Sequence, residues 1–188
     1  EFKAQLGGQG ARPNLFEVQL TFPAPPGEAS ELMKFMCKGA QLPGSDIGVV
    51  EVPYFGRNVK VPGNRTFPEW TSTVINDENF LVHAAFANWM DLINTHASNL
   101  QRMDRQDYQT QVDIVQYKKD GSIAKIVTLI NAWPTSIPAI ELGWDQNDAI
   151  EEFAVTWQYD YWKINDASSQ IGIDLSSDVN PLGPRLGI

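Results

Sequence analysis

The sequence has little cysteine, little histidine and fewer basic than acidic side chains. Its single cysteine, Cys37, cannot form an internal disulfide, and His83 and His96 are too few to build a zinc module with it. Lysine and arginine number 14 against 23 aspartate and glutamate residues, which gives a net charge of −9. Proteins that hold nucleic acid stably neutralise its phosphates with basic side chains. We therefore expect no disulfide scaffold, no zinc site and no stable nucleic-acid binding.

Long hydrophobic runs are also missing. No window approaches the roughly 18 uninterrupted apolar residues of a membrane-spanning helix. Residues 1–10 lack the basic and then apolar blocks of a secretory signal. We expect a soluble, intracellular protein without membrane contact. A chain of 188 residues, 43% of them hydrophobic, is long enough to bury one core but has little room for two.

The motifs of common enzyme classes are absent. The sequence contains no G-x-S-x-G elbow, no P-loop and no dinucleotide-binding fingerprint. Neither histidine lies in a catalytic motif, and Cys37 falls inside an expected strand, where a buried and unreactive thiol is the usual state. The acidic stretch after Asp145 departs from a calcium loop because Ala149 and Ile150 occupy its fifth and sixth positions. We expect no enzymatic activity, no metal and no cofactor.

What the sequence does contain is the period-two alternation of half-buried β-strands. Alternation is clearest from Phe153 to Trp162 and also marks Phe16 to Phe22. The remaining β-rich stretches are expected at residues 32–41, 69–76, 110–118, 123–133 and 137–142. These spacings predict a mainly β protein, an antiparallel β-barrel or sandwich of about seven strands.

A helical period occurs once. One helical stripe carries five apolar side chains: Val82, Phe86, Trp89, Met90 and Ile93. Asp77 is the expected N-cap, and Glu78 suits the positive end of the helix dipole. We therefore expect one α-helix that flanks the barrel.

Two hairpins are expected. Valine-rich arms between Ser45 and Arg65 surround residues 53–58, which predicts a long protruding hairpin with an aromatic tip. Asp120-Gly121 between two β-rich runs predicts a tight type I′ turn, which needs positive φ at both central residues.

Acidic residues gather in the last third of the chain. No basic residue lies between Lys125 and Lys163, whereas six acidic residues do. The resulting negative surface is either an ordinary solvated face or a surface that repels polyanions. The chain divides into an expected flexible arm (residues 1–11), a β domain (12–163) and an extended tail (164–188), and the tail is expected to gain order on assembly.

Several short motifs follow one another along the chain: Ala11-Arg12-Pro13-Asn14-Leu15-Phe16, Leu42-Pro43, Gly63-Asn64-Arg65-Thr66-Phe67 with Trp70, Asn76-Asp77-Glu78, Ala132-Trp133-Pro134-Thr135 and Asp160-Tyr161-Trp162. In their order and spacing they resemble the tail tube proteins of T-even-type contractile-tail bacteriophages. The resemblance runs from about Arg12 to Lys163. No single motif is diagnostic, but so many collinear matches indicate common descent.

The resemblance implies a structural virion protein. Homo-hexameric rings would stack into the inner tube of a contractile tail, and an acidic lumen would conduct DNA during ejection without binding it. The implied partners are the tail sheath, tape measure, baseplate and tail terminator proteins. The implied location is the virion, with the host cytoplasm during assembly.

The resemblance also suggests which residues make the contact between stacked rings. In the family the segment that reaches the adjacent ring corresponds here to Tyr54, Phe55, Arg57, Val59 and Val61, which we assign to ring stacking. The alternative is a hairpin packed on its own barrel.

Acidic residues on the polar faces of expected strands could line the lumen. The candidates are Glu17, Glu51 and Asp113. Alternation along a strand does not say which face is the lumen.

Three other functions remain open at this point. One is the inner tube of a tailocin or of a type VI secretion-like machine, which would share fold and ring. Another is a monomeric barrel that binds a small ligand among its tryptophans. An enzyme ranks last.

Overall fold

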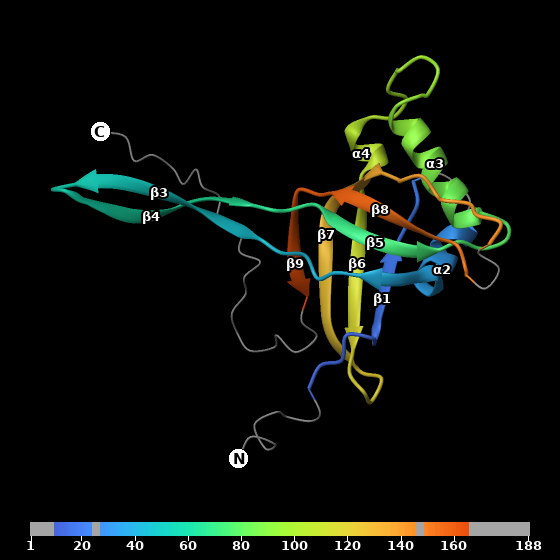
Figure 1. Ribbon diagram of the computed structural model, residues 1–188, viewed down its shortest axis with the longest axis horizontal. Coiled ribbons are helices and arrows are strands. Elements are labelled where there is room, and N and C mark those ends of the chain that lie inside the picture. Colours follow the sequence, from blue (N-terminus) through green and yellow to red (C-terminus); the bar gives the residue numbers. More distant parts are fainter. Residues whose placement is uncertain (1–9, 24–26, 146–148, 166–188) are drawn as a thin grey trace, which may run out of the picture.

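A computed structural model describes residues 10–23, 27–145 and 149–165 of the chain (Figure 1). Most of the expected N-terminal arm and C-terminal tail lie outside these residues. The elements in chain order are β1 (Phe16–Leu20), α2 (Gly27–Met36), β2 (Cys37–Ala40), β3 (Asp46–Tyr54), β4 (Arg57–Thr66), β5 (Trp70–Ile75), α3 (Leu81–Ile93), α4 (Arg105–Tyr108), β6 (Thr110–Tyr117), β7 (Ile123–Ser136), β8 (Glu152–Gln158) and β9 (Tyr161–Asn165).

Two antiparallel sheets make up the β structure. One has seven strands in the order β1-β6-β7-β8-β5-β2, with β9 also paired to β7, and the other is the β3-β4 pair. The 14-residue strand β7 pairs with β6 and β9 along its first part and with β8 from Trp133 to Ser136. A positive φ of 57° at Asn131 lies just before that change of partner. The expected mainly β, antiparallel architecture of about seven strands is confirmed.

The core lies between the sheet and α3. Trp70, Trp89 and Trp157 are buried, and the rings of Trp89 and Trp157 meet edge to face at 5.7 Å between centroids. The indole N–H of Trp157 donates to Ser72 Oγ (3.0 Å), and that of Trp89 donates to the Tyr108 carbonyl (2.8 Å). These three tryptophans therefore fill the core, with their polar atoms paired.

The strand expected over residues 32–41 is wrong for its first half, which belongs to helix α2. Ala29 and Met33, four residues apart, are both fully buried, and Met36 extends the same stripe. An ion pair between Glu31 and Lys34 (2.9 Å) lies on the exposed side. The segment therefore has helical periodicity, and α3 is not the one flanking helix.

Two further strand predictions need correction. Residues 137–142 form no strand, because Pro138 follows the end of β7 and offers no backbone donor. The single strand expected over 153–162 is two strands, β8 and β9, which pair with β7 at different places. The corner is held by Asp160, whose N–H donates to the Ile130 carbonyl (3.0 Å) and whose carboxylate accepts from Asn131 (2.7 Å).

Two local predictions also differ. Helix α3 begins after Phe80, so Asp77 is not its N-cap residue, although Asp77 Oδ1 accepts the Leu81 N–H (3.0 Å). The β6–β7 turn is wider than type I′, because the Lys118 N–H donates to the Ser122 carbonyl and Gly121, not Asp120, has positive φ. The structure instead places a tight turn with two positive φ values at Phe55 (46°) and Gly56 (74°).

Candidate functional site: an exposed two-stranded ribbon

Strands β3 and β4 form a ribbon that projects from the body (Figure 1). All nine residues of β3 are exposed, and in β4 Gly63 alone is half-buried. The long protruding hairpin with an aromatic tip, expected from the sequence, is therefore present. A two-stranded hairpin without a supporting layer is marginally stable in water. The ribbon thus lacks a second layer such as the one that α3 and the core provide for the seven-stranded sheet.

The register of the ribbon sorts its side chains onto two faces. Directly opposed residues of an antiparallel pair share a face. One face, here called the valine face, carries Val50, Val52, Tyr54, Arg57, Val59 and Val61. The other, here called the polar face, carries Val49, Glu51, Pro53, Asn58, Lys60 and Pro62. The ribbon is therefore amphipathic, although neither face is covered.

The valine face and the tip expose large apolar side chains. Phe55 at the tip is 91% exposed and Tyr54 is 64% exposed, and their rings meet edge to face with centroids 4.6 Å apart. The four valines of the face are each 40–50% exposed. A contiguous apolar patch of this kind marks an interaction surface in soluble proteins.

The polar side chains at the centre of the polar face pair with one another. Glu51 accepts a hydrogen bond from Asn58 Nδ2 (3.0 Å) and pairs with Lys60 Nζ at 3.6 Å. Both contacts are solvent-exposed and contribute little stability. They do neutralise the centre of this face, so the polar face suits water rather than an apolar partner.

Two tryptophans fix the base of the ribbon on the body. The indole N–H of Trp70 donates to the Gln41 carbonyl (2.5 Å), and that of Trp162 donates to the Gly44 carbonyl (2.9 Å). Both acceptors lie in the segment that leads into β3. Next to the base, a Cβ on Gly63 would approach the Gly48 carbonyl oxygen to 3.2 Å, so the strands need glycine there. The ribbon therefore leaves the body in a defined direction.

Of the five residues that the sequence assigns to stacking, four lie on the valine face and Phe55 forms the tip. Val50 and Val52 complete the same face and were missed as site residues. Their alternation with Glu51 and Pro53 was the signal that could have found them.

The three acidic lumen candidates do not lie together. Glu17 and Asp113 lie on the outer face of the β1-β6-β7 sheet, opposite the buried Val18 and Val112. Glu51 lies on the polar face of the ribbon, in the other sheet.

A polar network covers the outer face around Glu17 and Asp113. Tyr117 OH donates to Glu17 Oε2 (2.8 Å), Gln19 donates to Glu17 Oε1 (2.7 Å), and Thr128 Oγ1 donates to Asp113 Oδ1 (2.5 Å). Hydrogen bonding to the Glu17 carboxylate raises the pKa of Tyr117. One basic side chain, Lys163 of β9, lies on the same face, because it is paired with Thr128.

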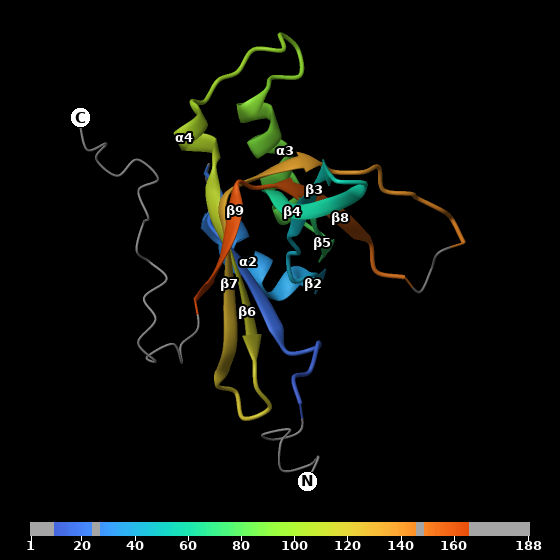
Figure 2. The same ribbon diagram turned by 90° about the vertical axis from the view of Figure 1, so that its left-hand side faces the viewer.

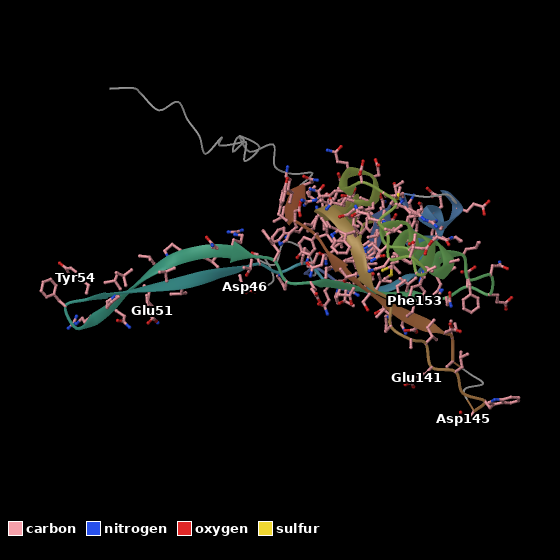
Figure 3. All side chains as sticks on the ribbon, turned by 90° about the horizontal axis from the view of Figure 1, so that it is seen from above. Asp46, Glu51, Tyr54, Glu141, Asp145 and Phe153 are labelled. Atoms are coloured by element: carbon pink, nitrogen blue, oxygen red, sulfur yellow. The ribbon has the colours of Figure 1, made fainter. Side chains whose placement is uncertain are left out.

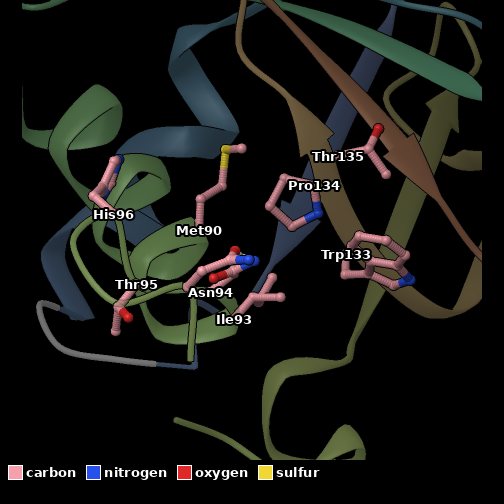
Figure 4. A pocket seen from close by; sticks show the side chains of 9 residues that line it. Met90, Ile93, Asn94, Thr95, His96, Trp133, Pro134 and Thr135 are labelled. Carbon is pink, nitrogen blue, oxygen red and sulfur yellow. Dashed lines mark hydrogen bonds between the residues drawn. The ribbon is translucent and has the colours of Figure 1, made fainter. Parts of the chain in front are cut away.

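A hollow of about 430 Å³ lies between the end of α3 and β7, lined by residues such as Met90, Ile93, Trp133 and Pro134 (Figure 4). His96 at its rim bonds Asp91 (2.7 Å), and this contact holds the pKa of Asp91 below its usual value. Among the residues that line the hollow, no serine or cysteine nucleophile accompanies the His96–Asp91 pair. Within the described part of the chain no cluster of three or more His, Cys, Asp or Glu could bind a metal, and no helix is long and apolar enough to span a membrane.

Comparisons with known proteins identify relatives of the whole β domain. The family described as phage tail tube protein matches residues 11–165. The tail tube protein gp19 of Enterobacteria phage T4 is 31% identical over 162 residues, which cover 86% of this chain and 96% of that protein. The tail tube protein of Serratia phage KSP90 is 25% identical over 163 residues, 85% of this chain and 92% of that protein.

Solved structures share the fold at low sequence identity. A chain from the baseplate of the anti-feeding prophage has a TM-score of 0.64 at 11% identity and covers 86% of this chain and 99% of its own length. A chain from the sheath-tube complex of an extracellular contractile injection system, PVC, has a TM-score of 0.56 at 15% identity, with 86% and 96% covered. These likenesses confirm the expected tube-like fold. The chain belongs to the phage tail tube protein family, and it is a structural, non-enzymatic tube protein of a contractile viral tail.

Proposed function

We propose that the chain assembles into hexameric rings, which stack into a tube through the ribbons. The observation that carries this proposal is the uncovered ribbon, with a valine face and tip that nothing in the described part of the chain buries. Covering such a patch stabilises an assembly by about 25 cal/mol for each Å² of apolar surface removed from water. In stacked rings, every subunit around the symmetry axis makes the ribbon contact with the same geometry.

We further propose that the outer face of β1, β6, β7 and β9 lines the bore of the tube. Glu17 and Asp113 hold negative charge there among neutral amide and hydroxyl groups. DNA that passes such a surface finds few cations to release its counterions, so it slides without binding. Glu51 is a separate candidate on the ribbon.

The partners of the tube follow from its place in a tail. The structures of similar fold come from a sheath-tube complex, a baseplate and a tube-terminating cap. We propose that this chain meets the corresponding sheath, baseplate and terminator proteins, and a tape measure protein within the bore. The inner tube of a tailocin or of a type VI secretion-like contractile machine is the second candidate, because a chain of an extracellular contractile injection system shares the fold. The 31% identity to a phage protein favours the phage tail.

Negative-stain electron microscopy of the purified protein tests assembly. At rising concentration we expect rings and then tubes whose class averages show sixfold symmetry. A single copy that persists at every concentration, or rings of another symmetry, would contradict the proposal.

Co-sedimentation with a labelled oligonucleotide tests the bore. Glu17→Lys with Asp113→Lys should give tubes that retain the oligonucleotide at low salt and release it at high salt. Glu51→Lys on the ribbon is the control, and it is compared with Glu17→Lys alone, which makes the same charge change on the outer face. Retention by the control alone would place the bore elsewhere.

A further inference from the structure

We infer that the ribbon tip of one copy docks head to tail on the segment between β7 and β8 of a second copy, through the valine face and Arg57. This inference rests on the proposed tube and names the surface that receives the ribbon. The described parts of that segment, residues 137–145 and 149–151, are here called the acceptor segment.

Strand addition along the edges of the ribbon is disfavoured. A two-residue turn makes Tyr54 and Arg57 a hydrogen-bonded pair, so the pairs Pro53–Asn58 and Val49–Pro62 fall at positions whose backbone groups point outward. Pro53 therefore removes a donor from the free edge of β3, and Pro62 removes one from the free edge of β4. Proline at such positions disfavours pairing with another strand. Side chains therefore offer the better contact, and the valine face is the apolar side of the ribbon.

The acceptor segment carries three strongly exposed apolar side chains close together in the sequence. Leu142, Trp144 and Ile150 are 85%, 102% and 71% exposed. The described parts of the segment extend away from the body (Figure 2) and flank a hollow of about 310 Å³. Apolar Ile140, Leu142 and Ile150 line it together with the acidic Glu141, Glu151 and Glu152. Exposed aromatic and aliphatic side chains around a hollow are what an aromatic tip such as Tyr54-Phe55 needs.

Charge complements the apolar match. Arg57 at the ribbon tip has no ion-pair partner among the described residues, and neither has Glu141 or Asp145. By contrast, Asp91 beside the hollow at α3 is already paired with His96 and Arg102. An arginine that approaches the acceptor segment therefore finds two available carboxylates, whereas at α3 the acidic group is occupied.

The two surfaces lie at opposite ends of the molecule. Figure 3 shows Tyr54 at one extremity and Asp145 at the other. Two different patches at opposite ends make a heterologous contact, which propagates from copy to copy. This is the geometry that stacking along a tube axis requires.

Disulfide trapping within assembled tubes tests the contact. Phe55→Cys with Trp144→Cys should cross-link into a ladder of dimers, trimers and higher species on a non-reducing gel, because each copy is linked at both ends. Such trapping requires Cα atoms within roughly 7 Å. The native Cys37 adds no background, because burial raises its pKa to about 12.

Three control variants distinguish the proposed docking site from other contacts. Phe55→Cys alone should stay uncross-linked, whereas dimers would indicate tip-to-tip docking. Phe55→Cys with Ser122→Cys, in the β6–β7 turn, should give no ladder. A ladder with Asn94→Cys, which lines the α3 hollow, in place of Trp144→Cys would place the tip in that hollow and overturn the inference, as would tubes in which no pair cross-links.

A charge exchange checks the same contact without cysteines. Arg57→Glu should reduce tube yield at least tenfold, and adding Glu141→Arg with Asp145→Arg should restore most of it. Failure of the exchange in a protein whose wild-type form makes tubes would refute the docking site alone. Failure of wild-type protein to form tubes would refute the proposed function, and this contact with it.

Discussion

Strands β8 and β3 both carry large apolar residues at alternate positions, but their environments are opposite. In β8, Phe153, Val155 and Trp157 alternate with polar residues and are buried to 2% exposure or less. In β3, Val50, Val52 and Tyr54 alternate in the same way and remain 46–64% exposed. Alternation thus shows that one face of a strand needs a cover. It does not show whether the cover belongs to the same chain or to another copy.

The largest expected effect is on the stability of the body, through the buried face of β8. Trp157→Ala removes a buried ring that contacts three other aromatic rings and donates to Ser72 Oγ. We expect the free energy of unfolding to fall by about 3–5 kcal/mol. Denaturant unfolding followed by tryptophan fluorescence measures it. An unchanged midpoint would mean that the core is not formed as described.

The next largest effect is on tube assembly, through the exposed tip of the ribbon. Phe55→Asp puts a charge into the dry contact proposed for the tip, at about 2 kcal/mol or more per contact. We expect tubes to shorten or vanish while the far-UV circular dichroism of the subunit stays the same. Asn58→Asp is the control, because it adds a negative charge near the tip on the polar face. Full-length tubes from Phe55→Asp would remove the tip from the interface.

A smaller effect lies at the join between the two regions. Trp162→Phe keeps an aromatic ring but removes the hydrogen bond to the Gly44 carbonyl, a contribution of about 1 kcal/mol. We expect faster amide exchange along β3 and β4, and fewer tubes, with little change in the exchange of β5 and β8. Equal acceleration of exchange in both regions would show that the ribbon and the body are not separately stabilised.

The smallest effect concerns the outer face of the body. The folded-state pKa of Tyr117 is raised by Glu17, so its contribution to stability is complete below the unfolded pKa of 10.0 and is lost as the pH rises through the folded value. Tyrosinate absorbance in Glu17→Gln should therefore appear at lower pH than in the wild type. Identical titration curves would mean that the two side chains are not in contact.

Sequence patterns predict much of the body because most elements there bury one face. Strand β1, the β6–β7 pair and the stripe of α3 show the expected periods in the structure. Helix α2 is not separated from strand β2 in the sequence pattern, because β2 begins at Cys37 directly after the helix ends at Met36 and no turn residue marks the boundary. The corner between β8 and β9 was missed because the alternation continues through Tyr159 and Asp160 while the pairing partner changes.

The candidate site was predicted in its position but not in its geometry. Tyr54 and Phe55 are recognisable as tip residues, since an aromatic pair between valine-rich arms suits a hairpin end. The sorting of Val50 and Val52 with Val59 and Val61 depends on register, which follows from the turn at Phe55-Gly56. The separation of Glu51 from Glu17 and Asp113 depends on sheet membership, which no local pattern contains.

The long strand β7 has a mechanical consequence. Its first part is paired with β6 and β9, and its last residues are paired with β8, which is in turn paired with β5 at the root of β4. One uninterrupted peptide backbone therefore joins the half of the body that carries the ribbon to the half that carries Glu17 and Asp113. Under the proposed stacking, tension that enters through the ribbon would meet covalent bonds at this crossing, so the two halves would not be free to slide apart.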